Sequence, residues 1–492
     1  MHFAALPDVR AGRFPANPCL ADDNMGRITN AEFLDLVQKY ADRLSKAGIG
    51  VGDVVAVMLP NRLELIVALF AAWRLGAAAT PIGPSLTSAE VEYQLNDSRA
   101  RVLVCADDGE SGQVDVPQRL SVPELDRHEG RVGDAEVTEF SNEALALIIY
   151  TSGTTGRPKG VELTHANIMA MAETMVAGMR LTAEDHSLLI LPLFHVNGIV
   201  VSVLSPLLAG GQTTVAGRFS PQTFFDRVEA ARPTYFSAVP AIYAMLSALP
   251  YEIRPDTSSV RFALCGAAPM PVELLARFEQ RYGVPIYEGY GLSEGTCAST
   301  GHPLDGVRKP GTVGIALPGQ EIAIVDSDGN FLGAGSVGEV VIKGPTVMRG
   351  YLGRPEETAQ VIVDGWLHTG DVGRIDADGY LTLVDRIKDM IIRGGENIYP
   401  KEIESAIYTH PQVLEAAVIG RAHPVYGEVP IAFVSYRDGA AIEPEQLLDL
   451  LRETLAGYKL PELIVTVEEI PKNPVGKIDK RTLRARSIDA PL

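Results

Sequence analysis

The stretch Tyr150-Thr-Ser-Gly-Thr-Thr-Gly-Arg-Pro-Lys-Gly160 brings three glycines, four serine or threonine hydroxyls and two cations together within eleven residues. Glycines let a backbone approach a polyphosphate, N–H groups and hydroxyls donate to its oxygens, and Lys159 or Arg157 offsets its charge. The apolar run 144–149 predicts a buried strand, and Thr164 is typical of a residue that caps a helix. The sequence therefore predicts a phosphate-binding loop where a strand passes into a helix.

The loop is not a P-loop. In that motif a lysine directly follows the last glycine and precedes serine or threonine, whereas Arg157 and Pro158 intervene here. A Gly-Thr-Thr-Gly string by itself would indicate only a flexible connection. The complete string favours a nucleotide loop of another kind.

Composition is typical of a globular enzyme with acidic character. The chain has 492 residues, 46% of them hydrophobic and 21% charged, which is too apolar for a disordered protein. A formal net charge of −19 argues against nucleic-acid binding. No apolar run is long enough to span a membrane, and the start lacks the parts of a signal peptide, so we expect a cytoplasmic protein. Four scattered cysteines without a CxxC pair argue against a zinc site or a disulfide framework.

The pattern of apolar and turn-forming residues changes twice along the chain. From residue 30 to about 290, helical spacing alternates with short apolar runs, which predicts parallel sheets flanked by helices. Beyond residue 310, short strands and turns such as Asp326-Ser-Asp-Gly329 predict a β-rich subdomain. The last hundred or so residues have their own strand and helix alternation. We expect an α/β protein with a large domain over residues 1–386 and a small one over residues 387–492, joined by a short hinge.

Three further segments suit a nucleotide. Tyr287-Glu-Gly-Tyr-Gly-Leu-Ser-Glu-Gly-Thr296 combines aromatic rings, glycines, a hydroxyl and a carboxylate. The small residues of Cys265-Gly-Ala-Ala-Pro-Met270 would let a flat base lie against the backbone. Gly365-Trp-Leu-His-Thr-Gly-Asp371 ends on a carboxylate that could accept both hydroxyls of a ribose. Taken alone, the first two segments could be ordinary turns, whereas Trp, His and Asp together favour a site.

Seven strings in this order resemble those of the adenylate-forming superfamily, in its acyl-CoA synthetase branch. They lie at 150–160, 192–198, 265–270, 287–296, 365–371, 385–400 and 472–480. The resemblance implies two α/β subdomains and a β-barrel-like subdomain, then a small mobile C-terminal α+β domain. It also implies an acid–CoA ligase that uses ATP, Mg²⁺ and coenzyme A. A carboxylate and MgATP would give acyl-AMP and pyrophosphate, and the thiol of CoA would then give acyl-CoA and AMP.

The resemblance assigns roles to single residues. Tyr290 is expected to stack on adenine, Ser293 to bond the α-phosphate, and Glu294 with Thr151 to hold Mg²⁺, a cation that prefers oxygen ligands. The residues expected to contact ATP or CoA are Thr151, Ser152, Gly153, Thr154, Thr155, Gly156, Lys159, Gly266, Ala267, Ala268, Pro269, Glu288, Gly289, Tyr290, Gly291, Asp371, Arg386, Lys388, Gly394 and Gly395. Among them Asp371 and Arg386 would hold the ribose, and Lys388 marks the hinge.

The chemistry needs a cation between two anions. When a carboxylate attacks the α-phosphate of ATP, an ammonium that contacts both aligns them and stabilises the transition state. Lys477 follows a loop shaped by proline and glycine and is the residue we expect there, whereas Lys480 is expected at the surface. The residues expected to act in catalysis are Lys477, Glu294, Ser293 and His195.

The acid is less well determined. Malonyl-CoA synthetases of this family carry an arginine where this chain has Gly289, so a dicarboxylate would lack its partner. The residues at family positions that line the acyl pocket are His195, Asn197, Val201, Gly266, Gly291, Cys297 and Ala298. Most are small and neutral, which favours a hydrophobic monocarboxylic acid, aliphatic or alicyclic, of medium or larger size.

Alternative functions differ in the acceptor or in the chemistry. An acyl-AMP ligase that loads a carrier protein would share the first half-reaction. A nucleotide-binding regulator without catalysis would not need Lys159, Glu294, Asp371, Arg386 and Lys477 together. A luciferase-like oxygenase is a third alternative. The sequence does not indicate the oligomeric state.

Replacing Lys477 with alanine tests the two-step scheme. We expect Lys477→Ala to lower adenylation by about 10²-fold or more, because the ammonium acts on the attacked phosphorus. Transfer from supplied acyl-adenylate to CoA should be spared. The two steps are measured by pyrophosphate release and by thioester formation, and an equal loss of both would contradict the scheme.

Overall fold

A computed structural model describes residues 2–106, 118–122, 136–151, 157–268, 270–437, 442–472 and 478–485. The predicted site residues outside these ranges are Ser152, Gly153, Thr154, Thr155, Gly156, Pro269 and Lys477. The chain divides into two compact units. Unit 1 comprises Met1–Ile322 and Ile342–His368, and unit 2 comprises Ala323–Val341 and Thr369–Leu492. The domain boundary expected at residue 386 stays a prediction.

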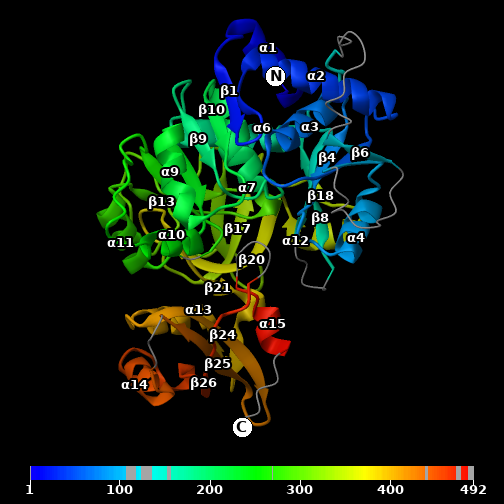
Figure 1. Ribbon diagram of the computed structural model, residues 1–492. Helices are drawn as coiled ribbons and strands as arrows, with labels where there is room; N and C mark the ends of the chain where they lie inside the picture. The colour runs from blue at the N-terminus through cyan, green and yellow to red at the C-terminus, as the bar shows by residue number, and fades with distance from the viewer. Residues whose placement is uncertain are drawn as a thin grey trace. The chain divides into compact units, whose positions relative to one another are not determined.

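Unit 1 contains a nine-stranded sheet whose central strands are parallel. Its order is β15 (Ile315–Ala316), β14 (Thr300–Gly301), β13 (Ile286–Tyr290), β12 (Phe262–Cys265), β11 (Tyr235–Ala238), β9 (His186–Leu189), β10 (Gln212–Val215), β1 (Pro18–Asp22) and β2 (Gly26–Thr29). Helices α9 (Pro221–Ala231), α10 (Pro240–Ser247) and α11 (Val272–Tyr282) lie together against this sheet (Figure 1). Their aromatic side chains Phe224, Tyr243 and Phe278 are buried in one apolar core with Phe236 of β11.

The second sheet of unit 1 has seven strands. Its order is β18 (Gly350–Tyr351), β8 (Lys159–Thr164), β7 (Leu145–Thr151), β4 (Ala78–Pro81), β3 (Val54–Met58), β5 (Val102–Cys105) and β6 (Arg119–Ser121). The helices of this part are α1 (Leu6–Arg13), α2 (Asn30–Lys46), α3 (Leu63–Arg74) and α4 (Ser88–Ser98). Trp73 anchors α3 to the sheet, because its buried indole Nε1 donates to the carbonyl of Ala146 in β7 at 2.8 Å.

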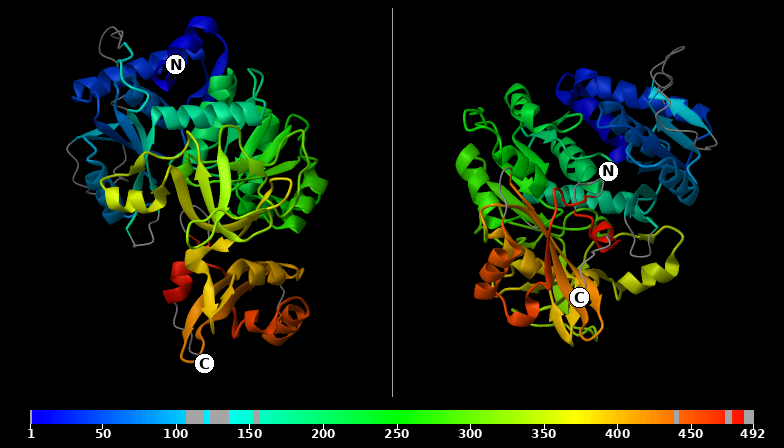
Figure 2. Two further views of the ribbon diagram at one scale, coloured as in Figure 1. Left: turned by 180° about the vertical axis from the view of Figure 1, so that it is seen from behind. Right: turned by 60° about the horizontal axis from the view of Figure 1, so that its bottom comes forward.

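Helix α6 (His165–Gly178) connects the two sheets of unit 1. It contacts β7 and β8 on one side, and α8 (Ser205–Ala209) and the π-helical segment η2 (Val200–Leu204) on the other. Figure 2 shows α6 in teal, crossing between the blue and green parts of the unit. Ile168, Met171 and Ala172 of α6 are fully buried. The helix therefore packs against elements that belong to both halves of unit 1.

The prediction that the phosphate loop leads from a strand into a helix is wrong. The loop joins β7 to β8, which pairs with it antiparallel, and α6 begins only behind Thr164. Strand β8 forms because Val161 and Leu163 are buried and alternate with the more exposed Glu162, the period-2 pattern of a strand. In the described part of the chain, a strand follows the loop, and the next helix begins only at His165. Thr164 caps α6 as predicted, in a reciprocal pair with Asn167.

The β-rich region predicted beyond residue 310 is present. A five-stranded sheet has the order β16 (Glu321–Val325), β17 (Gly338–Lys343), β20 (Trp366–Ile375) and β19 (Ile362–Val363), and β21 (Leu381–Arg386) also pairs with β20. Helix α12 (Pro355–Val361) comes directly before β19. The α/β fold class and its β-rich part thus follow the prediction.

The C-terminal part of unit 2 is a sheet with helices on both faces. Its order is β23 (Glu396–Ile398), β22 (Ile391–Arg393), β25 (Gly427–Tyr436) and β24 (Val413–His423), and β26 (Leu463–Thr466) pairs with β25. Helices α13 (Pro400–Tyr408) and α14 (Pro444–Thr454) share one apolar core, and α15 (Lys480–Ala485) contributes Leu483 to another. Figure 1 shows α14 and α15 on opposite sides of the sheet. Within the described ranges, no helix is both long and apolar enough to cross a membrane.

Asn167 is expected to be a stabilising residue of unit 1. Its Oδ1 accepts from the Thr164 N–H at 2.9 Å, and its Nδ2 donates to the carbonyls of Pro345 and Val347 at 2.8 and 2.9 Å. We expect Asn167→Ala to destabilise the protein by about 1–3 kcal/mol, since a buried side chain loses three hydrogen bonds and two partly buried carbonyls lose their donors. Thermal unfolding followed by circular dichroism measures this. Asn96→Ala, at an exposed position of α4, is the control and should leave the midpoint almost unchanged; an equal midpoint for both variants would contradict the prediction.

Candidate active site

The two ends of the phosphate loop are paired strand residues. In the β7–β8 ladder Thr151 lies opposite Lys159, and Tyr150 lies opposite Gly160. A Cβ on Gly160 would meet the Ile148 side chain at 2.9 Å, so this position requires glycine. The strand pairing therefore determines where the loop starts and where Lys159 emerges from it.

Lys159 and Glu294 are brought together by residues that the sequence patterns did not single out. The Lys159 side chain is only 12% exposed and forms an ion pair with Glu357 of α12. Its Nζ also lies 4.9 Å from the centre of the Tyr351 ring, and the hydroxyl of that tyrosine donates to Glu294 Oε1 at 2.9 Å. Glu294 lies in the 3₁₀ turn η3 (Ser293–Gly295). The phosphate lysine and the predicted metal carboxylate thus share Tyr351 as a neighbour.

The two segments predicted to contact adenine lie next to each other. Strands β12 and β13 are parallel neighbours, with Cys265 opposite Glu288, so the loops at their carboxyl ends share one edge of the sheet. A Cβ on Gly266 would lie 3.4 Å from the carbonyl of Gly289. Tyr290 ends β13 and is 8% exposed. The predicted adenine contacts Ala267 and Ala268 follow Gly266 and are both exposed.

The segment after Tyr290 is closely packed against itself. A Cβ on Gly291 would clash with the backbone of Cys297 and Ala298. Thr296 and Cys297 have φ values of 55° and 103°, which non-glycine residues rarely adopt. Position 291 therefore requires glycine, because the backbone of another segment occupies the space that a side chain would take. The missing side chain leaves no additional pocket volume.

The predicted acyl-pocket residues come from two segments that meet. Asn197, in the short helix α7 (Val196–Ile199), forms a side-chain hydrogen bond with Cys297. Burial raises the pKa of the Cys297 thiol to about 12, and the Asn197 bond lowers it by less, so the thiol stays neutral. Ala298 is partly exposed, whereas Val201 is 1% exposed within η2. The His195 ring lies 4.4 Å from that of Phe194.

In unit 2 the two predicted ribose residues contact each other. Asp371 and Arg386 are opposite residues of the β20–β21 ladder. The Arg386 Nε donates to Asp371 Oδ1 at 2.7 Å, and the Asp371 N–H donates to the Thr369 hydroxyl at 3.1 Å. Asp371 is 5% exposed. A buried carboxylate is thereby oriented by a guanidinium.

The predicted hinge residue Lys388 is exposed and lies in the short 3₁₀ turn η4 (Ile387–Asp389). Arg484 of α15 bonds Asp389 at 2.7 Å. The expectation that Lys480 is a surface residue is wrong, because its side chain is 18% exposed and pairs with Glu404 at 2.8 Å. Leu483 of the same helix is buried in a core, and the sequence around Lys480 did not indicate its distant partner Glu404.

Gly394 and Gly395 form the turn between β22 and β23. Their φ values are 60° and 90°, which are the positive values that tight hairpin turns require. The Gly394 N–H donates to the carbonyl of Tyr426 at 2.8 Å. Turn geometry alone is therefore sufficient to explain both glycines.

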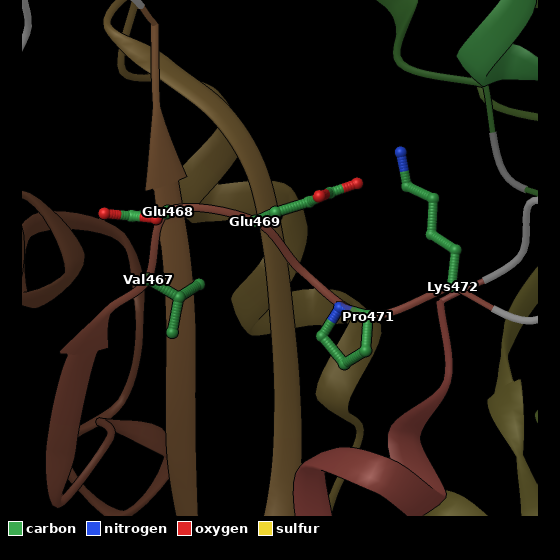
Figure 3. Close-up of a pocket in the computed structure, with 5 residues that line it drawn as sticks. All are labelled: Val467, Glu468, Glu469, Pro471 and Lys472. Carbon is green, nitrogen blue, oxygen red and sulfur yellow. The ribbon is translucent and has the colours of Figure 1, made fainter.

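Two hollows are present in the described part of the chain, and a predicted site residue lines one of them. One, of about 300 Å³ in unit 1, is lined by Glu288, with His302 and Arg308 among its other residues. Another, of about 560 Å³ in unit 2, is lined by Val467, Glu468, Glu469, Pro471 and Lys472 (Figure 3). Lys472 pairs with Glu415 at 2.8 Å. Carboxylates and a paired lysine do not suit a phosphate, so we assign no nucleotide contact to the second hollow.

Sequence patterns missed Tyr351 and Glu357. Both lie in the stretch 349–361, where an Arg-Pro-Glu-Glu string indicates a helix start and nothing more. Their importance comes from contacts with residues far away in the chain. The sequence shows only that Lys159 and Glu357 have opposite charges. Charge alone does not identify which residues will pair.

Two glycine variants test which of the two glycines is required by close packing and which has free space beside it. Gly291→Ala should destabilise unit 1 and lower the yield of folded protein, because a methyl group would clash with the Cys297 backbone. Gly266→Ala should fold normally, since the nearest atom lies 3.4 Å away. Thermal unfolding of both variants measures this, and a Gly291→Ala protein as stable as the Gly266→Ala protein would contradict it.

Comparison with known proteins agrees with this geometry. Residues 8–352 match the model of the AMP-binding enzyme family, and residues 402–477 match its AMP-binding enzyme C-terminal domain. The chain is 35% identical to an oxalate–CoA ligase of Arabidopsis thaliana, covering 98% of both chains. It is 37% identical to a feruloyl-CoA synthase of an Amycolatopsis species, covering 93% of this chain and 94% of that one.

Solved structures give the same result. ATP-bound MatB from Rhodopseudomonas palustris superposes with a TM-score of 0.90 at 32% identity, covering 98% of both chains. The o-succinylbenzoate CoA synthetase from Bacillus subtilis, in complex with its acyl-adenylate, gives a TM-score of 0.89 at 31% identity and the same coverage. The chain therefore belongs to the AMP-binding enzyme family, in the acyl-CoA synthetase branch of the adenylate-forming superfamily, and is an AMP-forming acid–CoA ligase.

Proposed function

We propose that this ligase activates a hydrophobic monocarboxylic acid of medium or larger size and transfers it to CoA. The choice of acid rests on one observation. Two uncharged side chains, those of Asn197 and Cys297, are hydrogen-bonded to each other, and the partly exposed Ala298 follows Cys297 in the chain. Gly289 provides no side chain for a second carboxylate, and a Cβ there would meet the Thr300 carbonyl at 2.9 Å. An ionic group on the acid would therefore lack a partner among these residues.

Each unit, considered by itself, offers residues that suit one part of the nucleotide. We assign the β- and γ-phosphates to Lys159 with the loop after Thr151, adenine to Tyr290 and the Gly266 segment, and ribose to Asp371 and Arg386. Mg²⁺ suits this arrangement, because it is commonly held by one or two carboxylates together with substrate phosphates. Glu294 is the carboxylate we assign to it, with the hydroxyl of Thr151 as a further ligand. When bound, the ion would neutralise charge on the phosphates.

Lys477 remains our choice for the cation at the attacked phosphorus. The neighbouring lysines Lys472 and Lys480 form ion pairs with Glu415 and Glu404. Taking either one for catalysis would leave a partly buried carboxylate without its partner, which is costly. Both lysines that the structure describes in the stretch 472–480 are therefore engaged in ion pairs, and this supports the choice of Lys477. We further propose that the small domain beyond residue 386 moves between the adenylation and thioester-forming steps.

A panel of carboxylic acids tests the proposed substrate. We expect pyrophosphate release to be fastest with aliphatic or alicyclic monocarboxylates of medium or larger size. Ala298→Leu should lower kcat/KM for the larger acids by about tenfold or more, since added methylenes fill space that the acid would occupy. It should change the rate with acetate much less. Turnover of malonate or oxalate alone would contradict the proposal.

The same assay separates CoA from a carrier protein as the acceptor. Enzyme, acid and ATP are incubated with free CoA in one sample and with a phosphopantetheinylated carrier protein in the other. We expect thioester with CoA. Thioester on the carrier alone would favour the alternative, an acyl-AMP ligase that loads a carrier protein.

A further inference from the structure

Tyr351 lies between two residues to which we have assigned the phosphates and the metal. Its ring faces the Lys159 ammonium at 4.9 Å, and its hydroxyl donates to Glu294 Oε1 at 2.9 Å. The three residues come from β8, the turn η3 and β18, which are distant in sequence. One side chain therefore contacts both a cation and a carboxylate of the nucleotide site.

We propose that Tyr351 is a positioning residue of the MgATP site, which holds Glu294 ready for the metal and Lys159 ready for the phosphates. The inference rests on the proposed roles of Glu294 and Lys159. It adds a residue that contacts neither the reacting atoms nor the acid, and it gives the ring and the hydroxyl of that residue separate functions.

The hydroxyl is suited to orient the carboxylate. The phenol O–H donates to Glu294 Oε1 at 2.9 Å, which restrains the position of that carboxylate. The bond engages Oε1, while Oε2 accepts no hydrogen bond from the residues that the structure describes. A partner that orients a metal-binding group in this way typically contributes about 10- to 100-fold to metal affinity.

The ring is suited to hold the lysine. A cation over an aromatic face is attracted by the negative charge of that face. Glu357 pairs with the same ammonium and also accepts from Arg354 Nη1 at 3.2 Å, and Lys159 is the main cause of the lowered pKa of Glu357. The carboxylate therefore keeps a cationic partner when Lys159 turns toward a phosphate.

Tyr351 is itself held firmly in place. Its backbone pairs with Val161 of β8, and its N–H donates to the Thr358 hydroxyl at 2.9 Å. A Cβ on the preceding Gly350 would meet the same threonine at 2.8 Å. Such support lets a side chain hold other groups in a working geometry before the ligand arrives.

Calorimetric titration of the full-length protein with ATP, in Mg²⁺ and in EDTA, tests the inference. Wild-type protein should bind ATP more tightly in Mg²⁺. Tyr351→Phe keeps the ring and should raise the Kd in Mg²⁺ by about tenfold or more, while the Kd in EDTA changes less than about twofold. Tyr351→Leu removes the ring as well and should weaken binding in both conditions. The control Tyr282→Phe removes a phenol bond to the Leu246 carbonyl, 2.6 Å long in the same unit, and should change neither value.

Two outcomes would overturn the inference alone. One is a Tyr351→Phe protein that keeps the wild-type Kd in Mg²⁺, and the other is an equal loss in Mg²⁺ and in EDTA, which would indicate a general structural role. Wild-type protein that binds ATP equally well in both conditions would overturn the metal role of Glu294 and this inference with it. Thermal unfolding of each variant confirms that it is folded.

Discussion

The pairing of β7 with β8 is the constraint on which the rest of the site depends. It places Thr151 opposite Lys159 at the ends of the phosphate loop. Strand β18 continues the same sheet and brings Tyr351 next to the lysine. The two ends of the loop thus take their place from a strand ladder, and the described residues that follow the loop continue as strand β8.

Close packing explains several glycines that a functional interpretation would assign to ligands. Gly291 lies against the backbone of Cys297 and Ala298, and Gly160 lies against the side chain of Ile148. Gly394 and Gly395 satisfy a turn. Gly266 differs, because a side-chain atom there would meet only an ordinary contact. A glycine-rich motif therefore contains both packing positions and positions open to a ligand, and only the structure separates them.

Paired charges limit which residues are available for chemistry. Lys472 and Lys480 are held by carboxylates, and Arg386 is held by Asp371. The first two pairs narrow the choice of catalytic cation, while the third fixes the orientation of a buried carboxylate. The same residue types are structural partners in one place and our candidates for ligand contacts in another.

The sequence by itself determined the family, the α/β class, the β-rich region and the strand before the phosphate loop, because each motif is local and its pattern of glycines, hydroxyls and apolar residues needs no distant partner. It also identified Asp371 and Arg386 before their pairing was known. Only the tertiary structure decided that β8 follows the phosphate loop, that Lys480 is paired, and that Tyr351 joins Lys159 to Glu294. These are contacts between residues far apart in the chain. A local sequence pattern does not determine which distant side chain a residue will contact after folding.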